Sequence, residues 1–567
     1  MNTKTNHLLL LLPIIMVISM TSITTARQQQ QVMVKHPIWP MPKHIQIKGQ
    51  DEYVKLASNF KFIAAYSIDK NNIQVPPILL NGMKRYEALL QNKLKLASSA
   101  TTTNYELLLL KTVATISKAN VHIKDKFESA NKLPNIKTNY EYSIKLSNGK
   151  ITIQATSVYG ALYGMESLLQ LVDPNTGTII GSNIEVVDKP DYAWRGLMID
   201  SGRRFFPMPL VKDLLDTMAS AKLNVLHLHA SDMCRFGIES KGFPNLTESL
   251  TGLHAGHYTQ EDIADMIAYA GQRGIRVIPE FDVPGHSRGL RPIKSMGVEF
   301  CDDDESQNQL YGDPHNSTYN TIYTLMKEMT ALFPDEVFNI GCDETSVKNR
   351  CTLNSTFEFE RTLLKAIQND FKKTPEGWEE ILYDADAATS DTIVNAWARH
   401  NASEIVSTGR KAVESKDAWF YFTDAAKGGP DGWTPCWNDI GYGIPEKEKH
   451  LLLGGEISMW SDTYCYIDQC GAFGPNEPVP VGSALFDPKY DAEFGQSIGG
   501  MIWPRGFVAA NAFWHYNATI SASSADFVAS VWKMNDEIAG RGLSTCPTKC
   551  SCDQLTACGK PYIVKSV

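Results

Sequence analysis

Short apolar runs alternate with stretches of helical periodicity from residue 194 onward. Helical periodicity occupies the segments Leu210–Ala221, Glu261–Gly274 and Thr318–Phe333. Strand-then-helix repeated over about 350 residues is typical of a (β/α)8 TIM barrel, an α/β fold. The apolar runs predict strands at Arg195–Asp200, Asn224–His229, Ile275–Asp282, Val337–Ile340, Thr392–Trp397, Ala418–Phe422 and Leu451–Ile457, and near Gly500–Trp503.

The pattern before residue 190 is different. Tyr140–Ala155 alternates apolar and polar residues on both sides of Ser147-Asn148-Gly149, which predicts a β-hairpin. Ser157–Val172 then has helical periodicity. Strands followed by a helix predict a smaller α+β domain ahead of the barrel. We therefore expect a signal peptide at 1–26, an α+β domain at 27–190, the barrel at 191–540 and a Cys-rich tail at 541–567.

Composition narrows the function classes. The chain has 567 residues, a net charge of −9 and no long basic block, so nucleic acid is not an expected partner. Its 11 Trp, 22 Tyr and 22 Phe residues include enough aromatic faces to line a sugar site, although most aromatic side chains in any protein belong to the core.

The N-terminus predicts export. Lys4 precedes the apolar run Leu8–Met20, and small residues continue to Ala26, as in a secretory signal peptide cleaved near that residue. The run is short for a membrane span, and an uncleaved anchor is the alternative. We expect no span in the mature chain, which would lie outside the cell, in the apoplast or at the plasma-membrane surface, with the vacuole as another destination.

Cysteines and sequons agree with export. Eleven cysteines predict disulfides and leave at least one thiol over. We expect Cys301 to pair with Cys351 and Cys465 with Cys470, and Cys342 to be free. The tail cysteines are Cys546, Cys550, Cys552 and Cys558, for which a zinc site is the alternative to bridges. Glycan acceptors are predicted at Asn245, Asn316, Asn354, Asn401 and Asn517.

Polar residues recur at the C-terminal ends of the apolar runs, where TIM barrels build active sites. The pair Asp343-Glu344 follows one such run, and the nearby carboxylates predict a raised pKa suited to a general acid. A helix N-cap or a calcium ligand pair is the alternative. Adjacent carboxylates fit poorly with the two separated groups of most glycosidases. They fit better a substrate whose own 2-acetamido group is the nucleophile.

At this point the motifs resemble one family, the family 20 β-N-acetylhexosaminidases, and its plant branch in particular. The similarity covers residues 140–515 in the family's order. The motifs are WRGLMIDSGRRFFP from Trp194, HLHASD from His227, PEFDVPGH from Pro279, GCDE from Gly341, GWEE from Gly377, AW at Ala396, GGE from Gly454, MW at Met459 and WPR from Trp503.

The resemblance implies roles for these residues. Glu344 is the expected general acid and base, and Asp343 orients the acetamide. Asp232 and His286 support the acid, although His286 is also explained as a structural histidine. The expected substrate-binding residues are Arg203, Trp378, Trp397, Tyr421, Trp460 and Asp462. No metal and no organic cofactor is implied, and homodimers are common in the family.

The expected function is exo-hydrolysis of terminal β-linked GlcNAc or GalNAc from N-glycans, glycoconjugates or chitooligosaccharides. The mechanism would be retaining and substrate-assisted, through an oxazolinium ion. Two alternatives stay open at the level of sequence. One is a secreted carbohydrate-binding protein on a hydrolase scaffold that has lost turnover, and the other is an endo-chitinase with an open groove.

Overall fold

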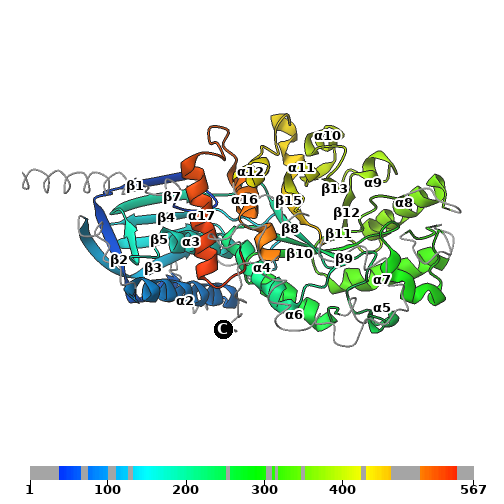
Figure 1. The fold of residues 1–567 in the computed structure, drawn as a ribbon, viewed down its shortest axis with the longest axis horizontal. Coiled ribbons are helices and arrows are strands. Elements are labelled where there is room, and N and C mark those ends of the chain that lie inside the picture. Colours follow the sequence, from blue (N-terminus) through cyan, green and yellow to red (C-terminus); the bar gives the residue numbers. More distant parts are fainter. Residues whose placement is uncertain are drawn as a thin grey trace, which may run out of the picture.

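The structure is a computed structural model with a small sheet domain packed against a closed barrel (Figure 1). It describes residues 37–64, 75–99, 110–125, 132–250, 256–301, 309–312, 317–345, 351–422, 430–461 and 498–545.

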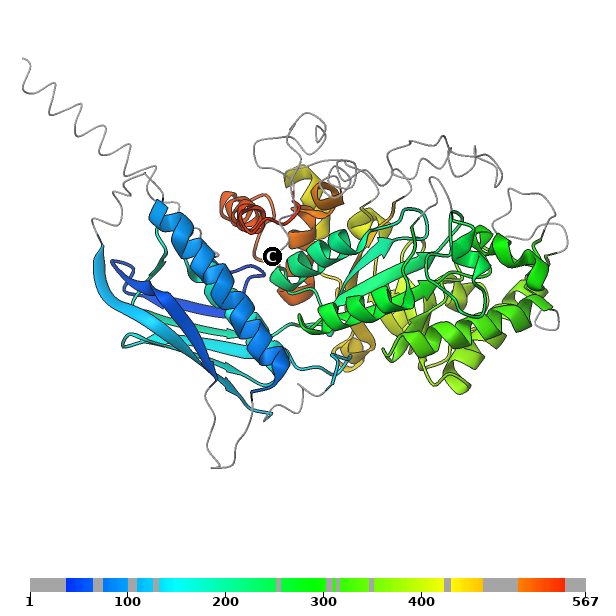
Figure 2. The ribbon, with the colours of Figure 1, turned by 90° about the horizontal axis from the view of Figure 1, so that it is seen from below.

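The small domain is a seven-stranded sheet with two long helices on one face (Figure 2). The strand order is β1-β7-β4-β5-β3-β2-β6, with β2, β3 and β5 parallel and the other pairs antiparallel. The predicted hairpin is confirmed as β4 and β5. The elements are β1 (His44–Lys48), β2 (Glu52–Ala64), α2 (Pro77–Ser99), β3 (Lys111–Ile123), β4 (Tyr142–Ser147), β5 (Lys150–Ala155), α3 (Val158–Leu171), β6 (Thr178–Ile180) and β7 (Asn183–Asp188).

Helix α3 lies between the sheet and the barrel, and all of its residues are buried. The sequence begins the helix at Ser157, whose side chain caps it by accepting from the Gly160 backbone N–H. A Cβ atom at Gly164 would lie 2.6 Å from the Ile153 side chain, so the absence of a side chain permits this close packing. The predicted helix is therefore confirmed as the layer that joins the domains.

Eight parallel strands close the barrel in the order β10-β11-β12-β13-β14-β15-β8-β9. Every residue of β8, β9, β10 and β15 is buried, as expected for strands covered on both faces. The strands are β8 (Trp194–Asp200), β9 (Val225–Ser231), β10 (Arg276–Phe281), β11 (Val337–Asn339), β12 (Thr374–Trp378), β13 (Ile393–Ala396), β14 (Lys411–Glu414) and β15 (Leu452–Met459).

Helices follow most of these strands on the outside. They include α4 (Met208–Ser220), α6 (Gln260–Gly271), α7 (Ser317–Leu332), α8 (Leu353–Asn369), α10 (Ala402–Ser407), α16 (Arg505–His515) and α17 (Ala525–Gly540). The predicted α/β barrel behind an α+β domain is confirmed. The exact domain boundaries remain predictions.

Two of the predicted strands are wrong. Ala418–Phe422 is the short helix α11 (Asp417–Phe420) followed by a single bridge from Tyr421 to Ser458. Its aromatic residues favour a strand, but Asp417 lies in the first turn and favours a helix start. Residues 498–502 are also helical, so no strand forms near Gly500–Trp503. The barrel uses β12 and β14 instead.

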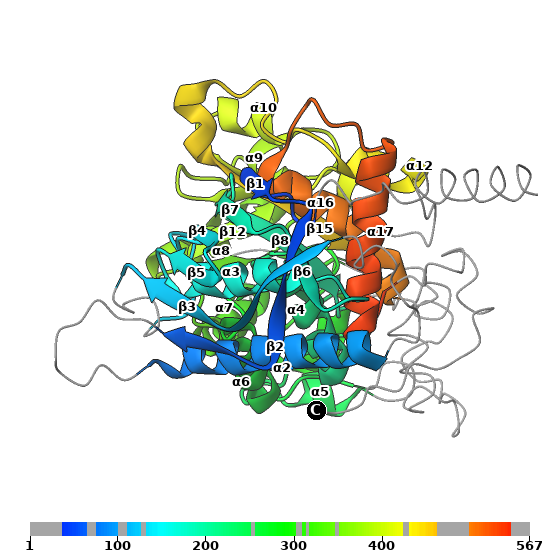
Figure 3. The ribbon, with the colours of Figure 1, turned by 90° about the vertical axis from the view of Figure 1, so that its left-hand side faces the viewer.

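Helix α17 connects the two domains by buried ion pairs (Figures 1 and 3). The ammonium group of Lys93 on α2 lies 2.8 Å from Glu537 of α17. Arg541, which caps α17, donates to both carboxylate oxygens of Glu166 on α3, at 2.7 and 3.0 Å. Within the described ranges, no helix is long and apolar enough to cross a bilayer.

Candidate active site

The C-terminal ends of the barrel strands bring the predicted site residues together. Arg203 follows β8, Asp232 follows β9, His286 follows β10 and the pair Asp343-Glu344 follows β11. Trp378 ends β12, Trp397 follows β13 and Trp460 follows β15. Parallel strands that start at one end of a barrel must finish at the other, so residues spread over more than 250 positions meet in one place.

The backbone separates the two adjacent carboxylates. The φ angles are 66° at Gly341, 69° at Cys342 and 49° at Glu344. Positive values are unusual for Cys342 and Glu344, because both have a side chain. A Cβ atom at Gly341 would lie 2.1 Å from Asp282, so only glycine fits there. As a result the Asp343 carboxylate is buried, whereas the Glu344 side chain is 59 % exposed at the barrel mouth. Left-handed residues concentrated at one strand end are typical of functional sites.

His286 sets the charge of Glu344. Its Nε2 atom lies 3.2 Å from Glu344 Oε2 and its Nδ1 atom 3.4 Å from Asp232 Oδ1. The hydrogen bond from His286 holds the pKa of Glu344 below its usual value. The expectation of a raised pKa for the acid is therefore wrong in this state. That expectation was based on the neighbouring carboxylate, whereas His286, which was expected to support the acid, has the larger effect on the pKa of Glu344.

Asp343 has a second acidic partner, Asp282, for which the sequence suggested no role. Burial, together with the charge of Asp343, raises the pKa of Asp282 well above its usual range, and burial also raises the pKa of Asp343. The two carboxyl groups interact, and protonation of Asp282 relieves the repulsion between them. Among the described residues, Asp343 Oδ1 has no hydrogen-bond donor and is an acceptor ready for an N–H group.

Arg203 is held by two carboxylates. Its terminal nitrogens lie 3.1 Å from Asp200 Oδ2 and 3.1 Å from Asp232 Oδ2, and its guanidinium lies 5.0 Å from the Trp460 ring centroid. The arginine is buried, so these are not surface ion pairs. Its Nη2 atom also lies 3.4 Å from His286 Nδ1, so groups from three strand ends fix the guanidinium at the barrel mouth.

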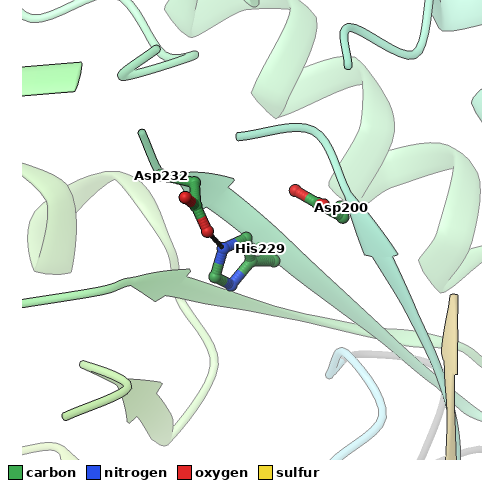
Figure 4. Close-up of side chains that lie close together, drawn as sticks. All are labelled: Asp200, His229 and Asp232. Atoms are coloured by element: carbon green, nitrogen blue, oxygen red, sulfur yellow. Dashed lines mark hydrogen bonds and ion pairs between the residues drawn. The ribbon is translucent and has the colours of Figure 1, made fainter. Parts of the chain in front are cut away.

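Asp232 also forms a hydrogen bond with His229, which Figure 4 shows together with the nearby Asp200. His229 Nε2 lies 2.8 Å from Asp232 Oδ2, and its Nδ1 lies 2.5 Å from Glu280 Oε2. Glu280 also contacts His227 Nε2 at 3.0 Å, and His227 Nδ1 reaches Glu456 at 2.8 Å. Glu280 and Glu456 lie within the PEFDVPGH and GGE motifs, but neither was assigned a role from its motif. The signal that could have identified them is a carboxylate inside an otherwise apolar strand.

Four aromatic side chains gather beside Asp343. Trp397 stacks on Tyr421 with 5.9 Å between centroids and 9° between planes. Tyr421 packs on Trp460 at 5.8 Å, and Trp460 on Trp378 at 5.9 Å. Trp378 and Trp460 are buried, whereas Trp397 and Tyr421 are partly exposed. The structure thus brings together the four aromatic residues that were predicted to bind the substrate.

Buried carboxylates orient two of these indoles. Trp378 Nε1 donates to Glu280 Oε1 at 2.8 Å, and Trp397 Nε1 donates to Glu380 at 3.1 and 3.2 Å. Burial raises the pKa of Glu380 to about 8. Neither carboxylate was proposed from sequence.

Among the residues that the structure describes, three overlapping sets of side chains have donor atoms close enough for a metal ion, and these three lie in this site. The sets are Asp200-His229-Asp232, Asp232-Asp282-His286 and His286-Asp343-Glu344. Each contains a histidine whose pKa is raised well above its usual value by neighbouring carboxylates that outweigh its burial. A protonated imidazole donates hydrogen bonds and does not ligate a metal, so charge pairing already explains these sets.

Other predicted positions have mixed outcomes. The Cys301–Cys351 disulfide is confirmed, and Cys342 is free and buried as expected. Asn245 and Asn354 are exposed, and Asn401 and Asn517 are half-buried. The remaining predicted residues lie outside the described residues, namely Asp462, Asn316, Cys465, Cys470, Cys546, Cys550, Cys552 and Cys558.

Comparisons with known proteins give a consistent result. Residues 192–468 match the description "Glycosyl hydrolase family 20, catalytic domain", and residues 38–171 match "beta-acetyl hexosaminidase like". The chain is similar to beta-hexosaminidase A of Caenorhabditis elegans, with 31% identity over 66% of this chain and 70% of that protein. It is also similar to the mouse beta-hexosaminidase subunit beta, with 27% identity over 85% and 91%.

Solved structures share the architecture. Flavobacterium johnsoniae chitobiase superposes with a TM-score of 0.68 and 25% identity, over 90% of this chain and 73% of that chain. A Vibrio harveyi exo beta-N-acetylglucosaminidase superposes with a TM-score of 0.63 and 20% identity, over 90% and 78%, which supports the fold alone.

Proposed function

Since the chain belongs to glycosyl hydrolase family 20 and is a glycoside hydrolase of the β-N-acetylhexosaminidase type, we propose that it releases terminal, non-reducing β-linked GlcNAc or GalNAc. The proposed mechanism is substrate-assisted and retains the anomeric configuration. The proposal rests on the different surroundings of the two adjacent carboxylates that follow β11. Asp343 is buried with an oxygen that lacks a donor among the described residues, and its neighbour Glu344 is exposed.

The first step breaks the glycosidic bond. The acetamido carbonyl oxygen attacks the anomeric carbon while Glu344 donates its proton to the leaving oxygen. The bond from carbon to the leaving oxygen breaks, and the departing alcohol leaves with that proton. Asp343 accepts a hydrogen bond from the acetamide N–H and stabilises the positive charge of the oxazolinium ion. The carboxylate is already in place before the reaction, so little reorganisation is needed when that charge develops.

The second step regenerates the enzyme. A water molecule attacks the anomeric carbon from the face that the alcohol left, and Glu344 takes its proton. The oxazolinium ring opens to the 2-acetamido group, and the two inversions give net retention. The aromatic walls Trp378, Trp397, Tyr421 and Trp460 hold the acetamido group against the sugar and exclude bulk water.

Acid conditions suit this cycle. Glu344 must be protonated for the first step, and because its pKa is lowered, protonation requires a lower pH than it would for an ordinary glutamate. We propose an acidic compartment of the secretory pathway or the space outside the cell as the place of action. The apolar N-terminal run and the exposed sequons at Asn245 and Asn354 support that route. The substrates we propose are N-glycans, glycoconjugates and chitooligosaccharides, and a homodimer is part of the same proposal.

The test is hydrolysis of an aryl β-GlcNAc and of the matching aryl β-glucoside, which lacks the acetamide. We expect activity on the first substrate alone. Glu344→Gln should abolish it when the leaving group is poor, and Asp343→Asn should reduce it about 100-fold or more because one charge at the oxazolinium ion is lost. Glu446→Gln removes an exposed carboxylate that pairs with Lys449 and serves as the matched control. Equal activity on both aryl glycosides would refute substrate assistance.

A further inference from the structure

Seven side chains form a continuous chain through the barrel interior, and acids and histidines alternate along it. It begins at Glu456 on β15 and ends at Glu344 at the mouth. The successive N···O distances are 2.8 Å from Glu456 to His227, 3.0 Å to Glu280, 2.5 Å to His229, 2.8 Å to Asp232, 3.4 Å to His286 and 3.2 Å to Glu344.

The inner part of this chain is closed to water. Glu456, His227, Glu280, His229 and Asp232 are all 0 % exposed. Charges attract strongly in such surroundings, and a buried charge that loses its partner is costly. Burial alone would lower the pKa values of His227 and His229, but the adjoining carboxylates raise both well above the usual value. Each histidine lies between two carboxylates, which favours its imidazolium form over the neutral form.

Glu280 and His229 do more than fill the barrel interior. We propose that Glu280 and His229 are positioning residues of the reaction: they hold a fixed ion pair behind Asp232 and so govern proton transfer at Glu344. This inference rests on the proposed role of Glu344 as the general acid. Glu280 also accepts the indole N–H of Trp378, so one carboxylate links the acetamide pocket to the acid.

Other charged groups face the same ion pair. His229 faces Asp200 from β8, Asp232 at the end of β9, and Asp282 after β10, in addition to Glu280. Glu280 also interacts with Asp343 after β11 and with Glu376 on β12. Asp232 is bound by three cationic groups: Arg203, His229 and His286. An effect on Glu344 must therefore be separated from a general change in barrel charge.

The sign of the effect follows from the order of charges. Glu280→Gln keeps the shape and an acceptor for Trp378, but it removes the anion that holds the second proton of His229. His229 then loses that proton, so one negative and one positive charge disappear, and the positive charge is the nearer to Glu344 in the chain. The acidity of Glu344 weakens, and the alkaline limb of the kcat/KM profile moves to higher pH by roughly half a pH unit at an effective dielectric constant of about 20.

Two further variants make the test graded. Glu456→Gln removes one negative charge at the far end of the chain, while His227 keeps its proton because it still has Glu280, so we expect a smaller shift in the opposite direction, to lower pH. Glu376→Gln is the matched control, because it changes another buried carboxyl of the barrel interior. Burial raises the pKa of Glu376 to about 8, so it is uncharged on the acid side and its amide should leave the profile unchanged.

The experiment records kcat/KM against pH for the full-length wild type and the three variants, after thermal unfolding confirms that each is folded. A shift to higher pH for Glu280→Gln, a smaller shift to lower pH for Glu456→Gln and no shift for Glu376→Gln support the inference. An unshifted Glu280→Gln, or an equal shift in the control, overturns it. If Glu280→Gln does not fold, an unshifted Glu456→Gln overturns it instead. Wild-type activity that survives Glu344→Gln would refute the proposed function and this inference together, whereas a Glu344-dependent enzyme with an unshifted limb refutes the inference alone.

Discussion

Replacing Arg203 with lysine tests whether the planar guanidinium is needed to bind both Asp200 and Asp232 and the sugar. The guanidinium spans Asp200 and Asp232, at 3.1 Å each, and lies over the Trp460 ring. A lysine ammonium is a compact charge that cannot reach both carboxylates with a planar fork. The variant keeps the charge of the site and loses the geometry.

The expected cost follows from the contacts that disappear. Losing one hydrogen bond between charged groups costs about 2 kcal/mol, which corresponds to about a 30-fold reduction in kcat/KM. Asp200 still accepts from the Ser461 backbone and hydroxyl, and Asp232 from His229, so the buried carboxylates retain partners. We therefore expect a folded protein with a damaged site.

The assay is steady-state hydrolysis of an aryl β-GlcNAc, with thermal unfolding measured in parallel. Arg276→Lys is the matched control, since Arg276 is equally buried and grips Asp335 with two nitrogens at the opposite end of β10. It should lose stability while keeping kcat/KM. A kcat/KM within threefold of wild type for Arg203→Lys, or an equal loss in the control, would show that the fork does not matter for the reaction.

Two further outcomes are expected. Trp397→Ala removes a partly exposed wall that stacks on Tyr421, so KM for the aryl β-GlcNAc should increase about tenfold, as steady-state kinetics will reveal. The melting temperature should be highest between about pH 4.5 and pH 6.5 in scanning calorimetry, and a maximum above pH 8 would contradict the charge alternation. The histidines have raised pKa values, so they stabilise the fold below about pH 6.5 and lose that effect as pH rises through their pKa values in the folded state. Glu280 and Asp232 have lowered pKa values, so they stabilise the fold above about pH 4 and lose that effect as pH falls.

The strands that the sequence predicted are those with a continuous apolar run. Val225–Ser231 and Leu452–Met459 are buried on both faces and were located to within a residue or two. Thr374–Trp378 contains a proline and a glycine, and Lys411–Glu414 has four residues with a charge at each end. Neither carries a periodic signal, and both are strands because barrel closure supplies their neighbours.

The candidate site could be predicted as far as single motifs reach. Asp343-Glu344 stands out because two carboxylates end an apolar strand. Asp282 could not be found in this way, since it comes from a different strand end and becomes a neighbour of Asp343 only in the closed barrel, whereas His286 was expected only through the family resemblance. The direction of the Glu344 pKa was missed for the same reason: it depends on which charge lies next to it in space.

The buried ion pairs of α17 have a consequence for how the polypeptide can be divided. A barrel released from the residues before it would leave Arg541 without Glu166, and Glu537 without Lys93, on a newly exposed apolar surface. A chain cut before residue 525 would strand Lys93 and Glu166 in the same way. We therefore expect the two domains to unfold in a single transition. A protease that removes the end of the barrel would then inactivate the hydrolase without approaching its active site.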